Sequence, residues 1–287
     1  MLKAEGEERN KMKKWILICV LCVAACDSPK PMAKGTLVII GGGSRPASII
    51  ERIIQEADLK AGGYGVVLPM SSASDSAVYY ASEPFRKAGV NNIVGLAFTK
   101  GEAPNQAKLD SLLNAKLIYI TGGDQSRFMG VVEGTPIVSA IRDAFERGAV
   151  VAGTSAGAAV MSEKMTTGNQ LRDTTYTSTF KVIESQNLEI KPGLGLITGV
   201  LIDQHFLIRS RHNRLLTGVI DYPDHTGIGI DESTAIVVKG RQAEVIGSSQ
   251  VIIIKNPTRS RKELGQKLGA EELVVSVLLP GALISLD

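Results

Sequence analysis

The chain contains 287 residues, of which 44% are hydrophobic and 21% are charged. A chain of this length and apolar content can bury a large core, which suits one large α/β domain or a domain with an appended lobe. Its formal net charge of +3 is too small to indicate a nucleic-acid-binding protein. Neither an internal repeat nor a low-complexity tract is visible in the sequence.

The N-terminus has the pattern of a bacterial export signal. Two lysines at 13–14 precede an apolar run at 15–23, which is too short to span a bilayer as a stable anchor. The run ends in Val-Ala-Ala-Cys at 23–26, which resembles a lipobox. Residues 1–25 are therefore predicted to be a lipoprotein signal peptide, with Cys26 as the lipidated first residue of the mature protein.

Two alternatives remain open for this segment. An ordinary secretory signal cleaved after Ala25 would release the protein instead of anchoring it. Met12 is an alternative start to Met1, because residues 2–11 form a long and acidic lead-in. We expect an exported, membrane-anchored lipoprotein in the periplasm or on the cell surface, with a secreted protein as the alternative.

The three cysteines, Cys19, Cys22 and Cys26, all lie in this N-terminal segment. The mature domain therefore has no disulfide framework and no thiol nucleophile, which excludes a cysteine hydrolase. Residues 26–34 read as a short tether, and residues 35–287 as a single α/β hydrolytic domain.

From Gly35 onward, apolar runs of strand length alternate with segments of helical periodicity. The predicted strands are 36–40, 64–69, 92–98 and 116–121, and the predicted helices are 46–57, 74–88, 105–114 and 136–147. This alternation predicts a mostly parallel sheet with helices on both faces. The loops that follow the strands should meet at one edge of the sheet, where such folds bind ligands.

Gly41-Gly42-Gly43 follows the first strand but does not complete a dinucleotide-binding fingerprint. Pro46 stands where the last glycine would be, and no acidic residue follows the second strand at the ribose position. The three glycines are instead expected to permit a close approach of the backbone near the site.

The most informative stretch is Gly-Thr-Ser-Ala-Gly at 153–157, which lies between an apolar run at 149–152 and an Ala-rich helical pattern. A strand, a sharp turn and a helix are the setting of a nucleophile elbow, with Ser155 at its apex. The N–H of Ala156 could then face a developing oxyanion. The alternative is a turn that only packs or binds an anion.

Candidates for the general base are limited to the histidines His205, His212 and His225. His205 is favoured because it ends an apolar strand at 200–206, where the edge carrying Ser155 is also expected. The other two are expected to be solvated. A polar stretch at 163–185 is expected to be a long surface excursion, and a helix is expected to begin near Arg209 and reach residue 220.

The acid that would orient the base has two candidates, Asp231 and Glu232, which lie between strand-like runs. Residues 256–270 are basic and read as irregular. Residues 273–279 read as one more strand, whose placement the sequence does not give.

Four motifs in order resemble the cyanophycinase branch of the peptidase family that also holds aspartyl dipeptidase. They are Gly-Gly-Asp-Gln (122–125), Gly-Thr-Ser-Ala-Gly-Ala (153–158), Asp-Gln-His-Phe with three trailing arginines (203–214) and Ile-Asp-Glu-x-Thr-Ala (230–235). The resemblance implies a flavodoxin-like, glutamine-amidotransferase-like α/β fold with extra C-terminal strands. It also implies exo-cleavage of cyanophycin, a poly-aspartate backbone with arginine on each β-carboxyl, to β-Asp-Arg dipeptides.

The same resemblance implies roles for individual residues. Ser155 would be the nucleophile, His205 the base and Glu232 its orienting acid, with Ala156 and Gly123 as oxyanion donors. The positions implied to line the substrate cleft are Gln125, Asp203, Gln204, Arg209, Arg211 and Arg214. A solvated helix face is the alternative for Arg211 and Arg214.

We expect no metal and no cofactor, and the resemblance suggests a homodimer. Two other classes stay open at this point. One is a related dipeptidase that acts on aspartyl or isoaspartyl peptides, and the other is a non-catalytic binding lipoprotein of the same fold.

Overall fold

The computed structural model describes residues 35–102, 104–173 and 175–286. The predicted signal peptide, Cys26 and the tether therefore lie outside the described residues. The described residues all belong to one compact unit. Within them, no helix combines the length and the apolar character that crossing a bilayer requires.

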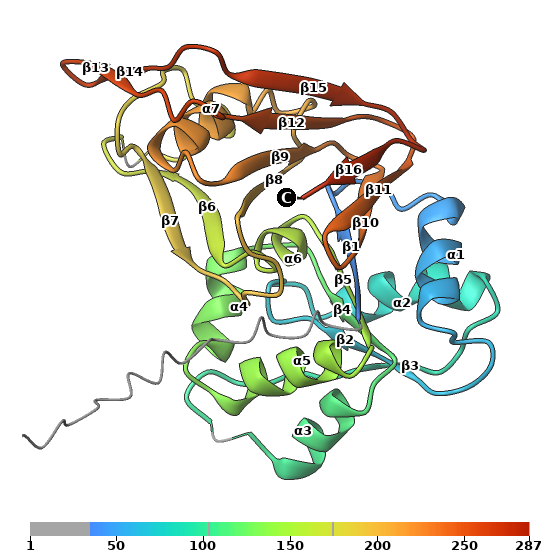
Figure 1. Ribbon diagram of the computed structural model, residues 1–287. Helices are drawn as coiled ribbons and strands as arrows, with labels where there is room; N and C mark the ends of the chain where they lie inside the picture. Colours follow the sequence, from blue (N-terminus) through green and yellow to red (C-terminus); the bar gives the residue numbers. More distant parts are fainter. Residues whose placement is uncertain (1–34, 103, 174, 287) are drawn as a thin grey trace, which may run out of the picture. The chain divides into compact units, whose positions relative to one another are not determined.

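The central sheet of the described chain has eight strands in the order β16-β11-β10-β1-β5-β4-β2-β3 (Figure 1). Their bounds are β1 Thr36–Ile40, β2 Gly65–Leu68, β3 Ile93–Gly95, β4 Leu117–Ile120, β5 Val150–Thr154, β10 Thr234–Lys239, β11 Gln242–Gly247 and β16 Leu283–Ser285. The strands β1 to β5 pair in parallel, whereas β10, β11 and β16 are added antiparallel. The predicted mostly parallel sheet with extra C-terminal strands is thus confirmed.

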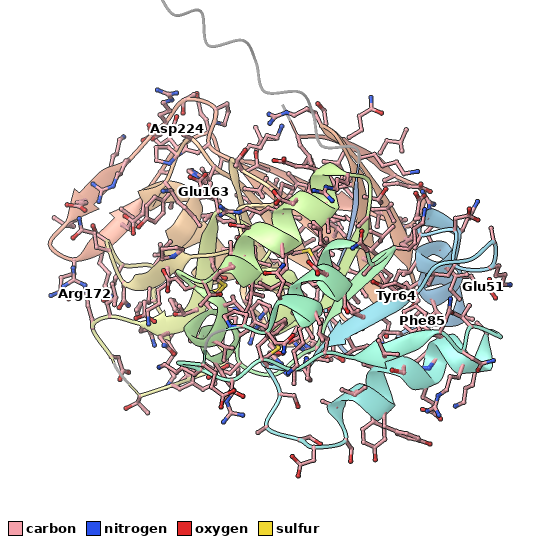
Figure 2. The ribbon with its side chains drawn as sticks, turned by 90° about the horizontal axis from the view of Figure 1, so that it is seen from below. Glu51, Tyr64, Phe85, Glu163, Arg172 and Asp224 are labelled. Carbon is pink, nitrogen blue, oxygen red and sulfur yellow. The ribbon has the colours of Figure 1, made fainter. Side chains whose placement is uncertain are left out.

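Helices cover both faces of this sheet. Their bounds are α1 Ala47–Glu56, α2 Ala77–Lys87, α3 Gln106–Leu113, α4 Gln125–Val132, α5 Pro136–Glu146, α6 Ala156–Ala159 and α7 His212–Asp221. In α1, Ile49, Ile50, Ile53 and Ile54 recur at helical spacing and are buried. Glu51 lies on the outer side of the same helix (Figure 2).

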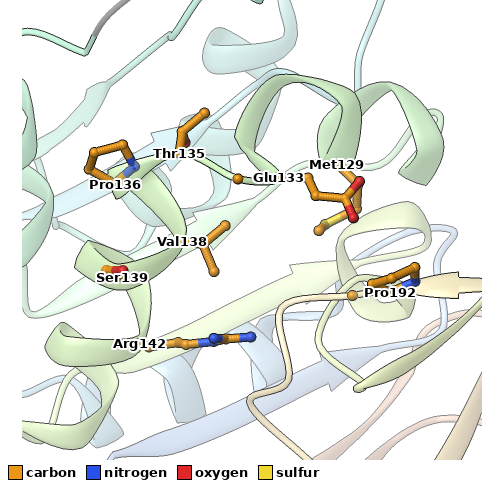
Figure 3. A pocket seen from close by; sticks show the side chains of 10 residues that line it. Met129, Glu133, Thr135, Pro136, Val138, Ser139, Arg142 and Pro192 are labelled. Carbon is orange, nitrogen blue, oxygen red and sulfur yellow. The ribbon is translucent and has the colours of Figure 1, made fainter.

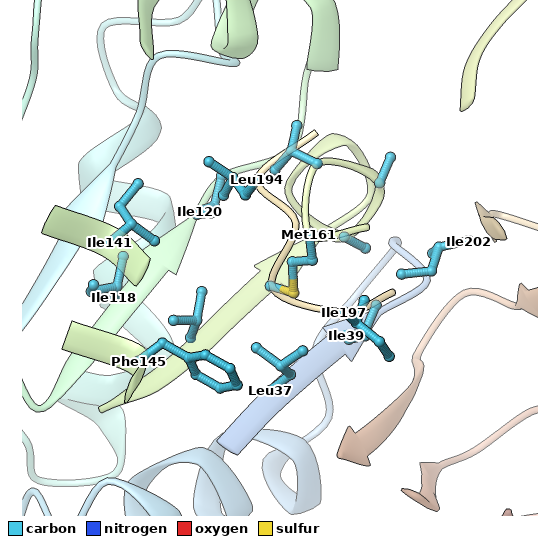
Figure 4. Close-up of a cluster of buried hydrophobic side chains, with 14 of the residues drawn as sticks. Leu37, Ile39, Ile118, Ile120, Ile141, Phe145, Met161, Leu194, Ile197 and Ile202 are labelled. Atoms are coloured by element: carbon cyan, nitrogen blue, oxygen red, sulfur yellow. The ribbon is translucent and has the colours of Figure 1, made fainter. Parts of the chain in front are cut away.

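The apolar strands explain why the sheet is covered on two sides. All residues of β1 and of β5 are buried, as expected for parallel strands between two layers of helices. One layer packs α1 and α2 against residues such as Val38 and Ile40. The opposite layer packs Ile141 and Phe145 of α5 against Leu37 and other side chains of the same sheet (Figure 4).

A second sheet of four strands lies beside the first, in the order β15-β12-β9-β8. Its strands are β8 Val200–Gln204, β9 Thr226–Ile230, β12 Val251–Lys255 and β15 Val274–Leu278. The sequence predicts strands at 200–206 and 273–279 but not their assembly into a separate sheet. Periodicity identifies a strand, whereas its partner depends on contacts distant in the chain.

Two segments contain strands that the sequence does not predict. The polar stretch after the elbow begins with β6 (Lys164–Gln170), which pairs with β7 (Leu188–Pro192). The basic segment near the C-terminus forms a hairpin of β13 (Lys262–Leu264) and β14 (Lys267–Gly269). The irregular reading of 256–270 is therefore wrong, and the surface excursion expected at 163–185 begins with a strand whose residues 165–168 are buried. The strands β6, β13 and β14 lack the apolar alternation by which a strand is recognised in a sequence.

Helix α4 is not predicted from the sequence. Its N-terminal signal is Asp124, whose carboxylate accepts hydrogen bonds from the N–H groups of Ser126 and Arg127. Helix α6 is shorter than the Ala-rich pattern suggests, and ends at Ala159.

Candidate active site

Ser155 stands on a sharp turn between β5 and α6. Its backbone has φ 54° and ψ −111°, an unusual conformation for a residue other than glycine. A β-carbon on Gly153 would lie 2.3 Å from the carbonyl oxygen of Gly157, and one on Gly157 would lie 2.3 Å from that of Ile120. Both glycines are therefore needed for the close packing that forms the elbow, as the sequence predicts.

His205 follows β8 of the second sheet, and it too has a positive φ, of 50°. Its N–H donates a hydrogen bond of 2.7 Å to the carbonyl oxygen of Gly41, which follows β1 of the central sheet. The N–H of Ser155 donates to the carbonyl oxygen of Ile40, one residue earlier. The end of β1 thus holds His205, which follows a strand of the second sheet, next to Ser155, which follows a strand of the central sheet.

The side chains of Ser155, His205 and Glu232 form one hydrogen-bonded chain. The Nε2 atom of His205 lies 2.7 Å from the Oγ of Ser155, and its Nδ1 lies 2.6 Å from Oε1 of Glu232. A carboxylate can only accept a hydrogen bond, so Nδ1 carries the proton and Nε2 is left to accept the serine O–H. The predicted convergence of these three residues is confirmed.

The glycine loop after β1 fits against this chain of side chains. A β-carbon on Gly42 would lie 2.3 Å from Cε1 of His205, and one on Gly43 would lie 2.7 Å from Oε2 of Glu232. The carbonyl oxygen of Gly42 also accepts a hydrogen bond from the N–H of Ser233. The expected close approach of the glycine backbone is therefore confirmed. Gly42 packs against the side chain of His205, and Gly43 packs against that of Glu232.

Asp231, the other candidate acid, has a different part in the site. Its Oδ1 accepts hydrogen bonds from the N–H groups of Leu207 and Ile208, and its Oδ2 accepts one from the hydroxyl of Ser249. Asp231 thus holds the turn that follows His205, while its neighbour Glu232 contacts the imidazole. The sequence alone does not show which of the two acids contacts the imidazole.

Burial lowers the pKa of His205 below its ordinary value of 6.5. The hydrogen bond to Glu232 acts in the opposite direction, and the positive charges of Arg209 and Arg211 lower the pKa further. The net direction is downward. The imidazole is consequently neutral at neutral pH, the form that can accept a proton.

The loop at Gly122 and Gly123 lies next to the serine. A β-carbon on Gly122 would stand 3.5 Å from the Cβ of Ser155. The hydroxyl of Ser71 donates to the carbonyl oxygens of Thr121 and Gly122, and these hydrogen bonds hold the loop in place. On the other side of the serine, the N–H of Ala156 starts α6 and has no acceptor inside that helix.

The six residues implied to line the cleft divide into two groups. Arg209 is exposed, and its charge, like that of Arg211, acts on the imidazole of His205. Gln204 directly precedes His205. Within the described chain, Gln204 Oε1 and Arg211 Nε are buried without a hydrogen-bond partner.

The other three bond to other parts of the protein, as does Arg211, whose Nη1 donates to the carbonyl oxygen of Gln204 over 2.7 Å. Asp203 and Arg214 are fully buried and form a two-point ion pair, in which Arg214 Nε donates to Asp203 Oδ2 over 2.7 Å. Gln125 is buried as well, and its Nε2 donates to the carbonyl oxygens of Thr166 and Thr167. These contacts tie the three side chains to the interior of the protein, and the substrate-lining role implied for them stays a prediction.

Two further expectations need correction. Helix α7 begins at His212, so Arg209 and Arg211 lie in the turn before it and not on its first turns. A solvated face is excluded for Arg211, which is buried and whose pKa burial lowers to about 10. His212 is exposed, as predicted, whereas His225 is partly buried.

A hollow of about 580 Å³ lies between the start of α5 and the end of β7, lined by Met129, Val138, Arg142 and Pro192 among others (Figure 3). The serine, histidine and glutamate described above do not line it. In the described part of the chain, no three His, Cys, Asp or Glu side chains are grouped so that they could hold a metal ion.

A serine at a strand–turn–helix elbow, joined through an imidazole to a carboxylate, defines a serine hydrolase of the α/β class. Residues 37–246 match the family model described as Peptidase family S51. The chain therefore belongs to this peptidase family, and it is a serine peptidase. The resemblance noted in the sequence is confirmed.

Relatives at the sequence level carry the name cyanophycinase. The protein of Nostoc sp. (strain PCC 7120) is 32% identical over 251 residues, which cover 84% of this chain and 80% of the relative. The protein of Geminocystis herdmanii is 38% identical over 157 residues, which cover 54% of each chain.

Solved structures share the fold. A peptidase from an acI-B1 Actinobacterium superposes with a TM-score of 0.61 at 22% identity, covering 85% of this chain and 97% of its own. A putative peptidase E from Listeria monocytogenes gives a TM-score of 0.53 at 14% identity, covering 76% of this chain and all of its own.

Proposed function

We propose that this chain hydrolyses the poly-aspartate backbone of cyanophycin and releases β-Asp-Arg dipeptides through an acyl-enzyme. The observation that carries the proposal is the contact of Ser155, His205 and Glu232, in which the acid sets the tautomer that a general base needs. The cyanophycinases to which the chain is similar support the choice of substrate.

In the first step, His205 Nε2 takes the proton of Ser155 as Oγ attacks the backbone carbonyl carbon of the substrate. The N–H groups of Ala156 and Gly123 stabilise the oxyanion of the tetrahedral intermediate. His205 then donates its proton to the nitrogen of the leaving amine, and the scissile C–N bond breaks. Glu232 stabilises the imidazolium while it exists.

The second step removes the acyl group. Water enters where the amine has left, gives a proton to His205 and attacks the ester carbonyl. The tetrahedral intermediate collapses as His205 returns that proton to the Oγ of Ser155. The released product carries the new carboxylate, and the serine is regenerated.

Recognition of the substrate falls to the groups around His205. A polymer with a free carboxylate and a guanidinium on each unit requires a cation and amide or acidic acceptors in the protein that binds it. Arg209 is the exposed cation beside the imidazole, while the unpartnered Gln204 Oε1 can accept a hydrogen bond and Arg211 Nε can donate one.

The test is incubation of the purified protein with cyanophycin, followed by mass analysis of the products. We expect β-Asp-Arg dipeptides with the wild type and none with Ser155→Ala. In parallel, aspartyl and isoaspartyl dipeptides without arginine are offered as substrates. Cleavage of these alone would refute cyanophycin as the substrate and assign the other peptidase activity.

We also propose that the protein is exported and anchored by a lipid on Cys26. The Val-Ala-Ala-Cys motif and the preceding apolar run support this proposal. Expression with a labelled fatty acid should place label on the wild type and recover the protein with membranes. Cys26→Ser should carry no label, and label retained by that variant would contradict the proposal.

A further inference from the structure

The hollow of about 580 Å³ at the start of α5 has no part in the hydrogen-bonded chain of the catalytic residues. Its volume lies within the range of about 300–1,000 Å³ that sites for small molecules occupy in proteins. The side chains of Met129, Val138 and Pro192 give it apolar walls (Figure 3). The hollow therefore has the size and the lining of a site for a ligand as large as a dipeptide.

Two opposite charges line the same hollow. The carboxylate of Glu133, just after α4, lies at one end, and the guanidinium of Arg142 lies at the other, with Val138 between them (Figure 3). Pro136, which also lines the hollow, is six residues before Arg142 on α5, a rise of about 9 Å along a helix. An extended dipeptide spans about 7 Å, and an arginine side chain adds to that reach.

Neither charge is neutralised by a neighbour within the described residues. The side chain of Glu133 makes no hydrogen bond or ion pair there. Arg142 makes a single side-chain hydrogen bond, in which Nε donates over 2.6 Å to the carbonyl oxygen of Leu194. That bond orients the guanidinium and leaves its two Nη atoms to bind a carboxylate. A ligand with a cation at one end and an anion at the other complements this arrangement.

The hollow is close to the catalytic centre without being part of it. The N–H of Leu194, whose carbonyl holds Arg142, donates over 2.6 Å to the carbonyl oxygen of Val160. Val160 ends α6, the short helix that begins next to Ser155. A ligand held by Arg142 therefore lies behind the elbow and leaves the catalytic serine unoccupied.

We propose that this hollow is a second, non-catalytic site for one arginyl unit, the guanidinium of which pairs with Glu133 while its carboxylate pairs with Arg142. The need for a ligand with both charges follows from the hollow itself, whereas the choice of β-Asp-Arg rests on the proposed function. The same chemistry has two sources, the released dipeptide and the units of the intact polymer.

The test measures by calorimetry the binding of the β-Asp-Arg dipeptide to Ser155→Ala, in which no turnover occurs. Adding Glu133→Gln should weaken binding about fivefold, the effect of one partly solvated ion pair. An analogue with citrulline in place of arginine ends in a neutral urea, and it should bind equally weakly with and without Glu133→Gln. This non-additive pattern would assign the guanidinium to Glu133.

Two further variants serve as controls for the binding site. Glu51→Gln removes an exposed carboxylate from α1, on the opposite face of the central sheet, and should leave dipeptide binding unchanged. Arg209→Gln, beside His205, should leave the loss caused by Glu133→Gln unchanged. Glu133→Gln should keep the melting temperature of its background, because the Glu133 side chain bonds to no other described residue.

Kinetics of the chain with Ser155 intact separate the two sources of the arginyl unit. Glu133→Gln should raise KM for cyanophycin if the hollow holds units of the polymer. If the hollow holds only the released dipeptide, that KM should stay the same, and inhibition by added dipeptide should weaken.

Equal dipeptide binding with and without Glu133→Gln, or no binding at millimolar concentration, would overturn the inference. Hydrolysis of cyanophycin by a chain that fails this binding test would leave the proposed function intact. Conversely, binding that depends on Glu133 in a chain without hydrolytic activity would refute only the proposed function.

Discussion

The α-carbon of Gly42 lies against the imidazole of His205, so closely that a β-carbon there would stand 2.3 Å from Cε1. The loop that carries Gly42 also binds the backbone near the base and the acid. Gly41 accepts a hydrogen bond from the N–H of His205, and Gly42 accepts one from the N–H of Ser233, the residue after Glu232. The glycine loop is thus the support on which base and acid are aligned with the serine.

Replacing Gly42 with alanine should displace the imidazole and disable the site. A displacement of about 1 Å at a reacting group costs roughly 100-fold in rate, and we expect a loss of kcat on that order. Gly130→Ala is the matched control, since a β-carbon at this position of α4 meets nothing within 4 Å. Full activity in Gly42→Ala would show that the loop does not position His205.

Replacing Glu232 with glutamine should lower kcat strongly at little cost in stability. The amide keeps the size of the side chain but removes the charge that stabilises the imidazolium, and it can stabilise the wrong tautomer of His205. Losses in such triads are on the order of 10⁴-fold. Equal changes in kcat and kcat/KM are the expected kinetic pattern. Asp231→Asn with the same loss would instead point to Asp231 as the acid.

The pH dependence of serine reactivity should report the low pKa of His205. Activity needs the neutral imidazole, so it should fall as the pH drops through a pKa below 6.5. Arg209 lowers this pKa, and Arg209→Gln should therefore move the acid limb to higher pH. The rate of labelling by a fluorophosphonate is the measurement, because it does not depend on peptide binding.

Lys60→Gln, a change of exposed charge on the surface, serves as the control for that shift. High salt should reduce the difference between Arg209→Gln and the wild type, since it screens an exposed charge. An acid limb that stays in place in Arg209→Gln would contradict the assignment.

The buried pair of Asp203 and Arg214 should matter for stability. Arg214→Met leaves the fully buried carboxylate of Asp203 without its two-point partner, which typically costs about 3–5 kcal/mol in the free energy of unfolding. The double variant Asp203→Leu/Arg214→Met removes both charges and should be destabilised less. Urea unfolding measures both. An unchanged stability with only a raised KM would mean that Arg214 binds substrate after all.

Much of the fold could be predicted because its strands and helices have strong local patterns. The apolar run of β1 and the isoleucines of α1 leave little choice of structure. The second sheet could not be predicted, since β8 and β15 look like any other strands until their partners are known. Helix α4 was missed because Gly130 and a short length weaken its pattern.

The same distinction applies to the site. Ser155 could be predicted, because the elbow needs small residues at fixed spacing around it. The positions of the three arginines could not be predicted, because a basic cluster looks the same in the sequence whether it faces a substrate or pairs with a buried aspartate. Only the structure separates exposed Arg209 from Arg214, which is paired in the interior.

The central claim is that Ser155 is a nucleophile activated by His205. Its most direct test is the intact mass of the protein after treatment with a serine-directed fluorophosphonate, with peptide mapping of the adduct. We predict one adduct on Ser155 in the wild type, none in Ser155→Ala and very slow formation in His205→Ala. An unmodified wild type, or an adduct that persists in Ser155→Ala, would contradict the account.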